Sequence, residues 1–379
     1  MKKDRNKPVA ASHIGKRLRL LCVLPVVLLF FSLGYVLSMI SNTSFSNFYF
    51  TFVPSLPSVE PSPPPPTPLS GAAMHNMTDE ELFRWASTAP KLHGTPYYRV
   101  PKVAFLFLVR GDLPLRPLWE KFFEGHDGLY SIYVHANPSY TGSAPRDSVF
   151  YGRMIPSQRT TWGGVSLVEA ERRLLANALL DLGNERFALL SESCIPLYNF
   201  STVYATLTAS RTSFVESLAL PARYDPLFAA RNNVTLAQWR KGSQWFEMDR
   251  ALAAEVAADV AYFPTFRELC ATQRFCVMDE HYVPTLASVR RWGGRNANRT
   301  LTFADWKPKR RTGSHPRTHG AEEVTEEFVR AVRAGAGTTN NCSDYDDGAA
   351  GVCFLFARKF GRDTLQPLLR LAPKVMGFG

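Results

Sequence analysis

Three apolar runs in the middle of the chain are separated by segments with helical spacing. The runs KVAFLFLVRG (102–111), LYSIYVHANP (129–138) and RFALLSESCIPLYN (186–199) are typical of strands buried on both faces of a sheet. Between them, residues 115–125 and 165–184 place apolar side chains on one face of a helix. This alternation predicts right-handed crossovers and an α/β fold with a mostly parallel central sheet and flanking helices.

Polar residues and turn formers follow each predicted strand. The segments are VRGD (109–112), VHANP (134–138) and SESCIPL (191–197). In parallel sheets, ligands bind beyond the carboxyl ends of the strands. We therefore expect a binding site where these three segments meet.

The first fifth of the chain has a different pattern. Residues 1–19 are rich in Lys and Arg, whereas residues 20–40 contain no charged side chain, and about 20 apolar residues suffice to span a bilayer. Basic residues flank only the N-terminal side of this run, which predicts a cytosolic tail followed by a transmembrane signal anchor. The proline-rich sequence after it predicts an extended stalk over residues 41–77. We expect a single-pass type II protein of the Golgi membrane, with residues 78–379 as its lumenal domain.

Glycosylation sequons and cysteines fit a lumenal location. Five of the six cysteines follow the predicted anchor, so at least one is unpaired unless chains cross-link. Pairing Cys270 with Cys276, and Cys342 with Cys353, would close the shortest loops, although the sequence leaves the connectivity open. The Asn-x-Ser/Thr sequons are at Asn42, Asn76, Asn199, Asn233, Asn298 and Asn341.

Charge and motifs argue against several function classes. The chain has a net charge of +11, of which residues 1–19 supply +6 from seven basic and one acidic residue, leaving +5 for the rest. That mild charge on a lumenal domain predicts no nucleic-acid partner. No GxGxxG, GxxxxGK[S/T] or GxSxG motif occurs, so dinucleotide folds, P-loops and hydrolase elbows lack support. Asp344 and Asp346 form an Asp-x-Asp in a polar loop with no strand before it, and we expect no metal site there.

Four motifs, in order, carry a resemblance to a known family. They are FALLSESCIPLYNF (187–200), WRKGSQWFEMDR (239–250), CVMDEHYVPTL (276–286) and GVCFLFARKF (351–360). In them the chain resembles the plant members of the core-2/I-branching β-1,6-N-acetylglucosaminyltransferase-like family (glycosyltransferase family 14), over residues 102–369. The resemblance implies a GT-A type fold and an inverting transfer, without a metal cofactor, from a UDP-sugar to a glycan or glycoprotein hydroxyl. The donor would carry N-acetylglucosamine, as in animal relatives, or glucuronic acid, as in some plant relatives.

The resemblance assigns the catalytic base to Glu280, in the family's Asp-Glu-[His/Tyr] stretch. Because proline fits a helix only in its first turn, Pro284 predicts a helix that begins near Tyr282. Glu280 would then lie close to the N-terminus of the helix, where the dipole favours an ionised carboxylate, and Asp279 would be the better N-cap. Residue types alone also allow a purely structural role, in which Asp279 and Glu280 are only an N-cap and its neighbour. The resemblance favours catalysis.

The resemblance also identifies groups for the donor. Lys359 matches a basic residue that stabilises the departing nucleotide diphosphate in place of a metal. The arginine that partners it in the family would be Arg333 or Arg330. The family's uridine-contacting segments match Val109, Arg110 and His135.

The acceptor sugar would be held by aromatic and polar side chains. Trp306 falls where the family has an acceptor-site tryptophan, and Arg240 and Lys241 resemble acceptor contacts. We interpret three further tryptophans as packing residues: Trp162, Trp239 and Trp245.

Two function classes remain. One is an active glycosyltransferase, and the other is an inactive lumenal glycan-binding or scaffold protein that keeps the fold. The presence of both Glu280 and Lys359 favours the enzyme. A glycosidase would need a second carboxylate across the sugar, and neither Glu192 nor Glu247 is singled out for it. The sequence does not indicate an oligomeric state.

Overall fold

The structure is a computed structural model that describes residues 75–88, 100–272, 276–306, 315–335 and 351–379. The chain divides into two compact units, residues 1–67 and residues 68–379. Every described residue belongs to the second unit. The predicted cytosolic tail, the sequon at Asn42 and nearly all of the predicted stalk lie outside the described residues.

The predicted fold class included an N-terminal transmembrane helix, and this part of the prediction is corrected. In the described ranges, no helix is long and apolar enough to cross a bilayer. The predicted span, residues 20–40, lies outside those ranges. The prediction was based on the length of an uncharged run and on the basic residues before it, and a sequence pattern of this kind does not by itself establish a helix. The fold class is therefore mixed α/β, and the transmembrane helix is removed from it.

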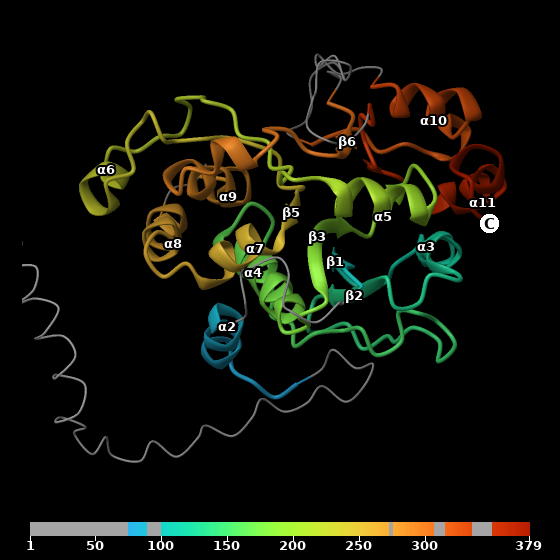
Figure 1. The fold of residues 1–379 in the computed structure, drawn as a ribbon, viewed down its shortest axis with the longest axis horizontal. Helices are drawn as coiled ribbons and strands as arrows, with labels where there is room; N and C mark the ends of the chain where they lie inside the picture. The colour runs from blue at the N-terminus through green and yellow to red at the C-terminus, as the bar shows by residue number, and fades with distance from the viewer. Residues whose placement is uncertain (1–74, 89–99, 273–275, 307–314, 336–350) are drawn as a thin grey trace, which may run out of the picture. The chain divides into compact units, whose positions relative to one another are not determined.

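A four-stranded main sheet lies at the centre of the second unit (Figure 1). Its order is β2 (Tyr130–His135), β1 (Lys102–Leu108), β3 (Asn184–Ser191) and β5 (Glu247–Asp249). β1 runs parallel to β2 and β3, as the strand–helix alternation predicts, and β5 is antiparallel to β3. Leu108 is paired with His135 on one side and Ser191 on the other, so the three parallel strands end together.

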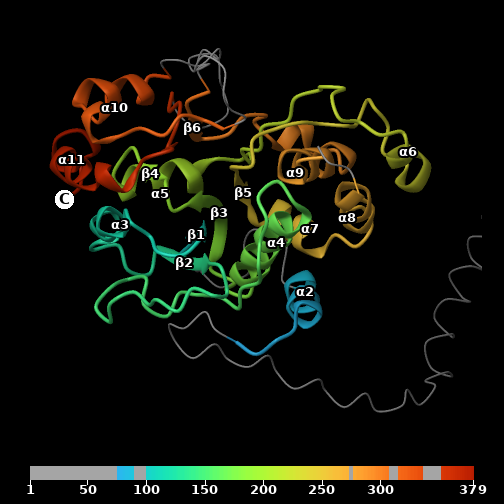
Figure 2. The same cartoon turned by 180° about the vertical axis from the view of Figure 1, so that it is seen from behind.

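The main sheet is buried on both faces. Side chains alternate along β1, so that Phe105 and Phe107 belong to one hydrophobic core and Ala104 and Leu106 to the other. Figures 1 and 2 show helices on both faces of the sheet. The core of Phe105 includes side chains of α3 (Arg116–Phe123) and α5 (Phe200–Ala209), and that of Ala104 includes side chains of α4 (Val165–Leu179) and α7 (Arg250–Ala258).

A smaller sheet brings the C-terminal part of the chain beside the main sheet. Its order is β4 (Ile195–Pro196), β7 (Phe356–Arg358) and β6 (Thr302–Ala304), with β6 parallel to β7. Ala304 is paired with Arg358, so Trp306 and Lys359 leave this sheet at the same end. The other helices are α2 (Asp79–Thr88), α6 (Leu227–Asn232), α8 (Phe263–Thr272), α9 (Met278–Val289), α10 (Glu326–Arg333) and α11 (Leu365–Leu371), with short helical turns at Trp292–Arg295, Ala321–Glu323, Arg362–Thr364 and Ala372–Met376.

The disulfide pattern agrees with the short-loop pairing. Cys270 and Cys276 are bonded and join the end of α8 to the residues before α9, which confirms that pairing. Cys353 is also disulfide-bonded, and its expected partner, Cys342, lies outside the described residues. Cys194 is buried and free.

The described sequons differ in accessibility. Asn76, Asn233 and Asn298 are exposed. Asn199 is half-buried, and its side-chain oxygen accepts the backbone N–H of Thr202 at 2.9 Å as the N-cap of α5. The sequon at Asn341 lies outside the described residues.

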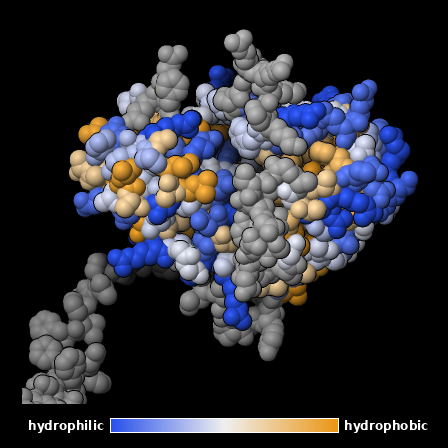
Figure 3. All heavy atoms as spheres, turned by 90° about the horizontal axis from the view of Figure 1, so that it is seen from above, coloured by the Kyte–Doolittle hydropathy of each residue, from blue (hydrophilic) through white to orange (hydrophobic). Residues whose placement is uncertain are grey.

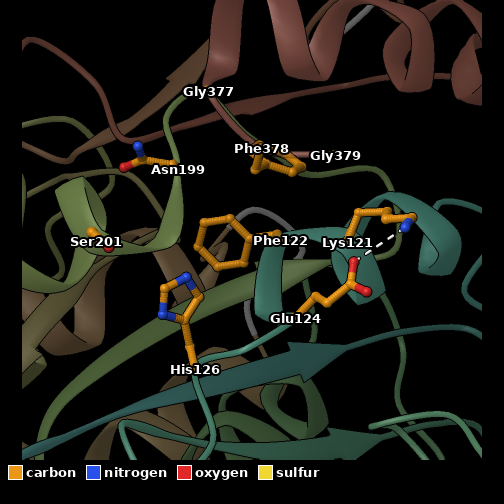
Figure 4. A pocket seen from close by; sticks show the side chains of 9 residues that line it. All are labelled: Lys121, Phe122, Glu124, His126, Asn199, Ser201, Gly377, Phe378 and Gly379. Carbon is orange, nitrogen blue, oxygen red and sulfur yellow. Dashed lines mark hydrogen bonds and ion pairs between the residues drawn. The ribbon is translucent and has the colours of Figure 1, made fainter.

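Two surface features lie apart from the strand ends. Hydrophobic residues gather on the side of the molecule that carries α6 (Figure 3), where the leucines at 218, 220, 227 and 236 are 42 to 50% exposed. A cavity of about 270 Å³ is lined by the end of α3 and by the residues 377–379. Phe122, His126 and Phe378 face one another across it (Figure 4). None of its lining residues was predicted to act in catalysis or substrate binding.

Candidate active site

Helix α9 begins at Met278, four residues before the predicted start, so that prediction is wrong. Its N-cap is Val277, which has a left-handed φ of 46° and makes no side-chain cap, so Asp279 is not the N-cap. Pro284 consequently lies inside the helix. Glu280 still falls in the first turn, where the helix dipole favours a negative charge.

The carboxylate of Glu280 is held by two cations. Its Oε2 lies 3.0 Å from Nζ of Lys241 and 3.2 Å from Nη1 of Arg223. The Glu280 side chain is 21% exposed, so solvent or a substrate can reach it. Lys241 was predicted to contact the acceptor, and the structure brings it to the predicted base. Arg223 was missed, because the irregular segment that carries it has no pattern to single it out.

Three further carboxyl groups lie near Glu280 or its neighbour Asp279, and burial raises the pKa of each. The pKa of Asp279 rises to about 6, chiefly through burial. Burial raises the pKa of Glu171 well above its usual range, and the negative charge of Asp279 adds to this. Burial also raises the pKa of Glu216, with Lys241 opposing the shift. Among these four acids, Glu280 is the one with two cations against one oxygen.

The other predicted acceptor contact on this segment points elsewhere. Nη1 of Arg240 donates to the backbone carbonyls of Ala237 and Trp239, at 2.7 and 2.8 Å. Trp239 is 1% exposed and Trp245 5% exposed, which confirms both as packing residues.

A cluster of cations lies at the strand ends. Partial burial, and then the positive charges of Arg358 and Arg110, lower the pKa of Lys359. Arg110 is the second residue after the end of β1, and its Nε lies 4.0 Å from the Glu192 carboxylate. Two predicted donor residues, Lys359 and Arg110, are therefore close enough to interact electrostatically. We refer to Lys359, Arg110 and Arg358 as the cation cluster.

The other predicted uridine contacts are buried beside it. The N–H of Val109 donates to the carbonyl of His135 at 2.9 Å and ties the ends of β1 and β2 together. The His135 ring is fully buried, and its Nε2 accepts the N–H of Gln158 at 3.2 Å. Burial, reinforced by the charge of Arg173, lowers the pKa of His135 to about 4, so the imidazole is neutral near pH 7.

Trp162 is not a packing residue, and that interpretation is wrong. Its side chain is 56% exposed, and its ring centroid lies 4.5 Å from that of His315. Partial burial, and then the charges of Lys359 and Arg110, lower the pKa of His315, so this aromatic pair borders the cation cluster. The sequence around Trp162 could have indicated that it is exposed, because Trp162 lies in the polar segment TTWGG, outside any periodic pattern of apolar residues.

Trp306 is also accessible. It is 59% exposed and follows β6, which pairs in parallel with the strand that precedes Lys359. The predicted acceptor tryptophan and the predicted phosphate-binding lysine thus follow neighbouring parallel strands.

The two arginines predicted to partner Lys359 are engaged elsewhere. Nη1 of Arg333 donates to the carbonyl of Val375 at 2.6 Å, and its guanidinium lies 3.8 Å from the ring centroid of Tyr198. Arg330 pairs with Glu326 one turn earlier in α10, at 2.7 Å. The structure instead places Arg110 and Arg358 beside Lys359.

The candidate second carboxylates of a glycosidase are not placed as a pair with Glu280. Glu247 is fully buried, where its oxygens accept the N–H of Leu301 and the hydroxyl of Thr302, both at 2.9 Å. Burial raises the pKa of Glu247 to about 7. Glu192 faces Arg110.

Potential metal ligands are sparse in the described residues. No group of three or more His, Cys, Asp or Glu side chains there could hold a metal ion. Asp344 and Asp346 lie outside the described residues.

One segment connects the carboxylates to the cation cluster. The Gln244 amide donates to Glu171 at 2.8 Å, on the side of the acids. The next residue, Trp245, packs its ring 4.1 Å below the guanidinium carbon of Arg358. Residues 240–245 therefore reach from Glu280 to the neighbour of Lys359.

Comparison with known proteins gives two matches. The family model for the core-2/I-branching enzyme matches residues 103–333. The chain is 35% identical over 311 residues to a rice (Oryza sativa subsp. japonica) protein called Glycosyltransferase BC10, and this match covers 72% of the chain and 76% of the rice protein. The family model contains the segment of Glu280 and ends before Lys359.

Proposed function

The chain belongs to the core-2/I-branching enzyme family and is a glycosyltransferase, and on this premise we propose that it transfers a sugar from a UDP-sugar to a glycan or glycoprotein hydroxyl, with inversion and without a metal cofactor. The sugar is N-acetylglucosamine or glucuronic acid. A β-1,6 linkage to N-acetylglucosamine follows the resemblance of the four motifs. Trp306 and Lys241 contact the acceptor.

The observation that carries this proposal is the cation cluster at the strand ends. A departing nucleotide diphosphate develops negative charge, and preorganised cations stabilise that charge most strongly in a site with little water. Partial burial, and then the charges of Arg358 and Arg110, lower the pKa of Lys359, and a bound diphosphate would relieve the repulsion among these cations. We assign both to the phosphates, in place of a Lys359–Arg333 or Lys359–Arg330 pair.

In the reaction, Glu280 acts as the general base. The acceptor hydroxyl gives its proton to the carboxylate as its oxygen bonds to the anomeric carbon. The bond from that carbon to the diphosphate oxygen breaks, and its electron pair leaves with UDP. Attack from the face opposite the leaving group inverts the anomeric centre. Because Lys241 and Arg223 both contact Oε2, we assign Oε1 as the oxygen that receives the proton.

We place this reaction in the Golgi lumen. The disulfide between Cys270 and Cys276 supports an oxidising compartment, since such bonds rarely persist in the cytosol. The exposed sequons at Asn76, Asn233 and Asn298 fit exposure to the glycosylation machinery.

A donor panel tests the proposed function without knowledge of the acceptor. The melting temperature of the purified protein is measured with each of several UDP-sugars, and the slow hydrolysis of each donor is measured in parallel. We expect UDP-N-acetylglucosamine or UDP-glucuronic acid to raise the melting temperature most, and Lys359→Ala to abolish the rise. If neither donor raises the melting temperature or is hydrolysed, the proposal fails.

A further inference from the structure

Pro284 lies four residues after Glu280, inside helix α9. In an α-helix the N–H of residue 284 would donate to the carbonyl of residue 280. Proline has no N–H, so the carbonyl of Glu280 receives no such bond. A proline in a helix interior is destabilising, and the sequence alone gives no reason for one here.

The carbonyl of Glu280 is instead taken by another segment. The N–H of Gly242 donates to it at 2.8 Å. The residue before, Lys241, places its Nζ 3.0 Å from the Glu280 carboxylate. The backbone and the side chain of the predicted base are therefore held by two consecutive residues.

Gly242 lies where there is no room for a side chain. A Cβ at this position would overlap the carbonyl oxygen of Glu216 and lie 3.1 Å from Cγ of Pro284. Any residue with a side chain would clash with the backbone of Glu216 and crowd the ring of Pro284, so the segment would have to move. Glycine lets the two backbones approach.

Further contacts fix the same segment along α9. The N–H of Arg240 donates to the hydroxyl of Thr285 at 3.0 Å, and Nδ1 of His281 lies 2.8 Å from the carbonyl of Arg240. On its other side, Lys241 exchanges two backbone hydrogen bonds with Leu218, at 2.7 and 2.9 Å. The segment is held from both sides at the level of the base.

We propose that Pro284 and Gly242 are positioning residues for the transfer reaction. Pro284 leaves the Glu280 carbonyl free, and Gly242 binds that carbonyl and sets the distance between Lys241 and the base. This backbone lock fixes where Glu280 meets the acceptor hydroxyl. The inference rests on the proposed role of Glu280 as the base.

The variant Pro284→Ala tests the lock without removing any side chain that touches substrate. It supplies an N–H that competes with Gly242 for the Glu280 carbonyl, and alanine is a better helix former than proline. We expect an unchanged or higher melting temperature and faster hydrogen exchange at the Gly242 amide. A misplaced catalytic group can cost about 100-fold, so kcat should fall roughly 10- to 100-fold, with the donor KM within about twofold of wild type.

Pro264→Ala is the matched control. Pro264 is an exposed proline in the first turn of α8, where its missing N–H leaves no helical hydrogen bond unmade. We expect it to leave kcat and the exchange of the Gly242 amide at wild-type values.

Three results would overturn the inference. They are unchanged exchange at Gly242 in Pro284→Ala, unchanged kcat despite faster exchange, and a melting temperature several degrees lower. The last would mean that Pro284 supports the fold itself. Failure of the proposed function would look different, because Glu280→Gln would then retain activity whatever the exchange at Gly242.

Discussion

The four acidic side chains around the start of α9 are all carboxylic acids, but the structure gives them different burial and different charged neighbours. Glu171 and Asp279 are buried, and burial raises the pKa of both, to about 6 for Asp279. Glu280 is accessible and faces Lys241 and Arg223. A base must be ionised and reachable, and among these acids Glu280 best meets both requirements.

Glu280→Gln is expected to abolish transfer while leaving the fold intact. Glutamine keeps the shape and one carbonyl oxygen, but it cannot take a proton, and loss of a general base costs about 10² to 10⁴ in rate. Melting temperature and UDP affinity should stay close to wild type, as measured by thermal unfolding and calorimetry. Transfer within about threefold of wild type would exclude this base, given the loss expected.

Asp279→Asn is the neighbouring control. It removes a buried carboxyl whose Oδ1 has no hydrogen-bond partner among the described residues. Because Asp279 does not cap α9, the variant should keep the stability of the protein and most of its transfer activity. A loss as large as that of Glu280→Gln would mean that the two acids act as one unit.

At the scale of elements, a buried glutamate joins the two sheets. Glu247 on β5 accepts hydrogen bonds from Leu301 and Thr302 at the start of β6. Burial raises the pKa of Glu247 to about 7, from an ordinary value of 4.5. The folded protein therefore binds a proton more tightly than the unfolded chain, and the free energy of unfolding falls as the pH rises through this range.

Glu247→Gln should remove that pH dependence. A shift of this size corresponds to about 3 kcal/mol of stability present below pH ~4.5 and lost by pH ~7 and above. Urea unfolding at several pH values should show the variant gaining stability relative to wild type as the pH rises. The exposed Glu80→Gln serves as the control and should parallel wild type. Parallel curves for Glu247→Gln as well would show that Glu247 does not titrate differently on folding.

The sequence predicted the parallel strands and not the smaller sheet. β1, β2 and β3 are six to eight residues long and apolar, so their pattern is visible. β5, β6 and β7 have three residues each, too few for any period to appear, and their pairing depends on distant segments. For the same reason the partner of Lys359 could not be read from nearby arginines: Arg110 lies about 250 residues before it in the chain and meets it only in the fold. The start of α9 was missed because Pro284 is accommodated by a tertiary hydrogen bond.

At the scale of the whole molecule, the donor-side groups come from three distant parts of the chain. Arg110 follows the first strand, Trp162 precedes α4, and Lys359 follows the last strand. The fold brings Arg110 close to Lys359, although the two follow strands of different sheets, so both cations can share one diphosphate. Arg330 on α10 is paired with Glu326, so a variant at Arg330 serves as the matched control for a variant at Lys359.

The last prediction asks whether these cations suffice without a metal. UDP binding and transfer should survive EDTA, because Lys359 and Arg110 supply the positive charge. Lys359→Ala should weaken UDP binding roughly 10- to 150-fold, since a hydrogen bond to a charged group contributes about 1.5 to 3 kcal/mol. Arg330→Gln should bind UDP like wild type, and calorimetry with and without EDTA measures all three proteins. If EDTA abolished binding and manganese restored it, the cation cluster would be insufficient, and Asp344 and Asp346 would become the metal ligands to test.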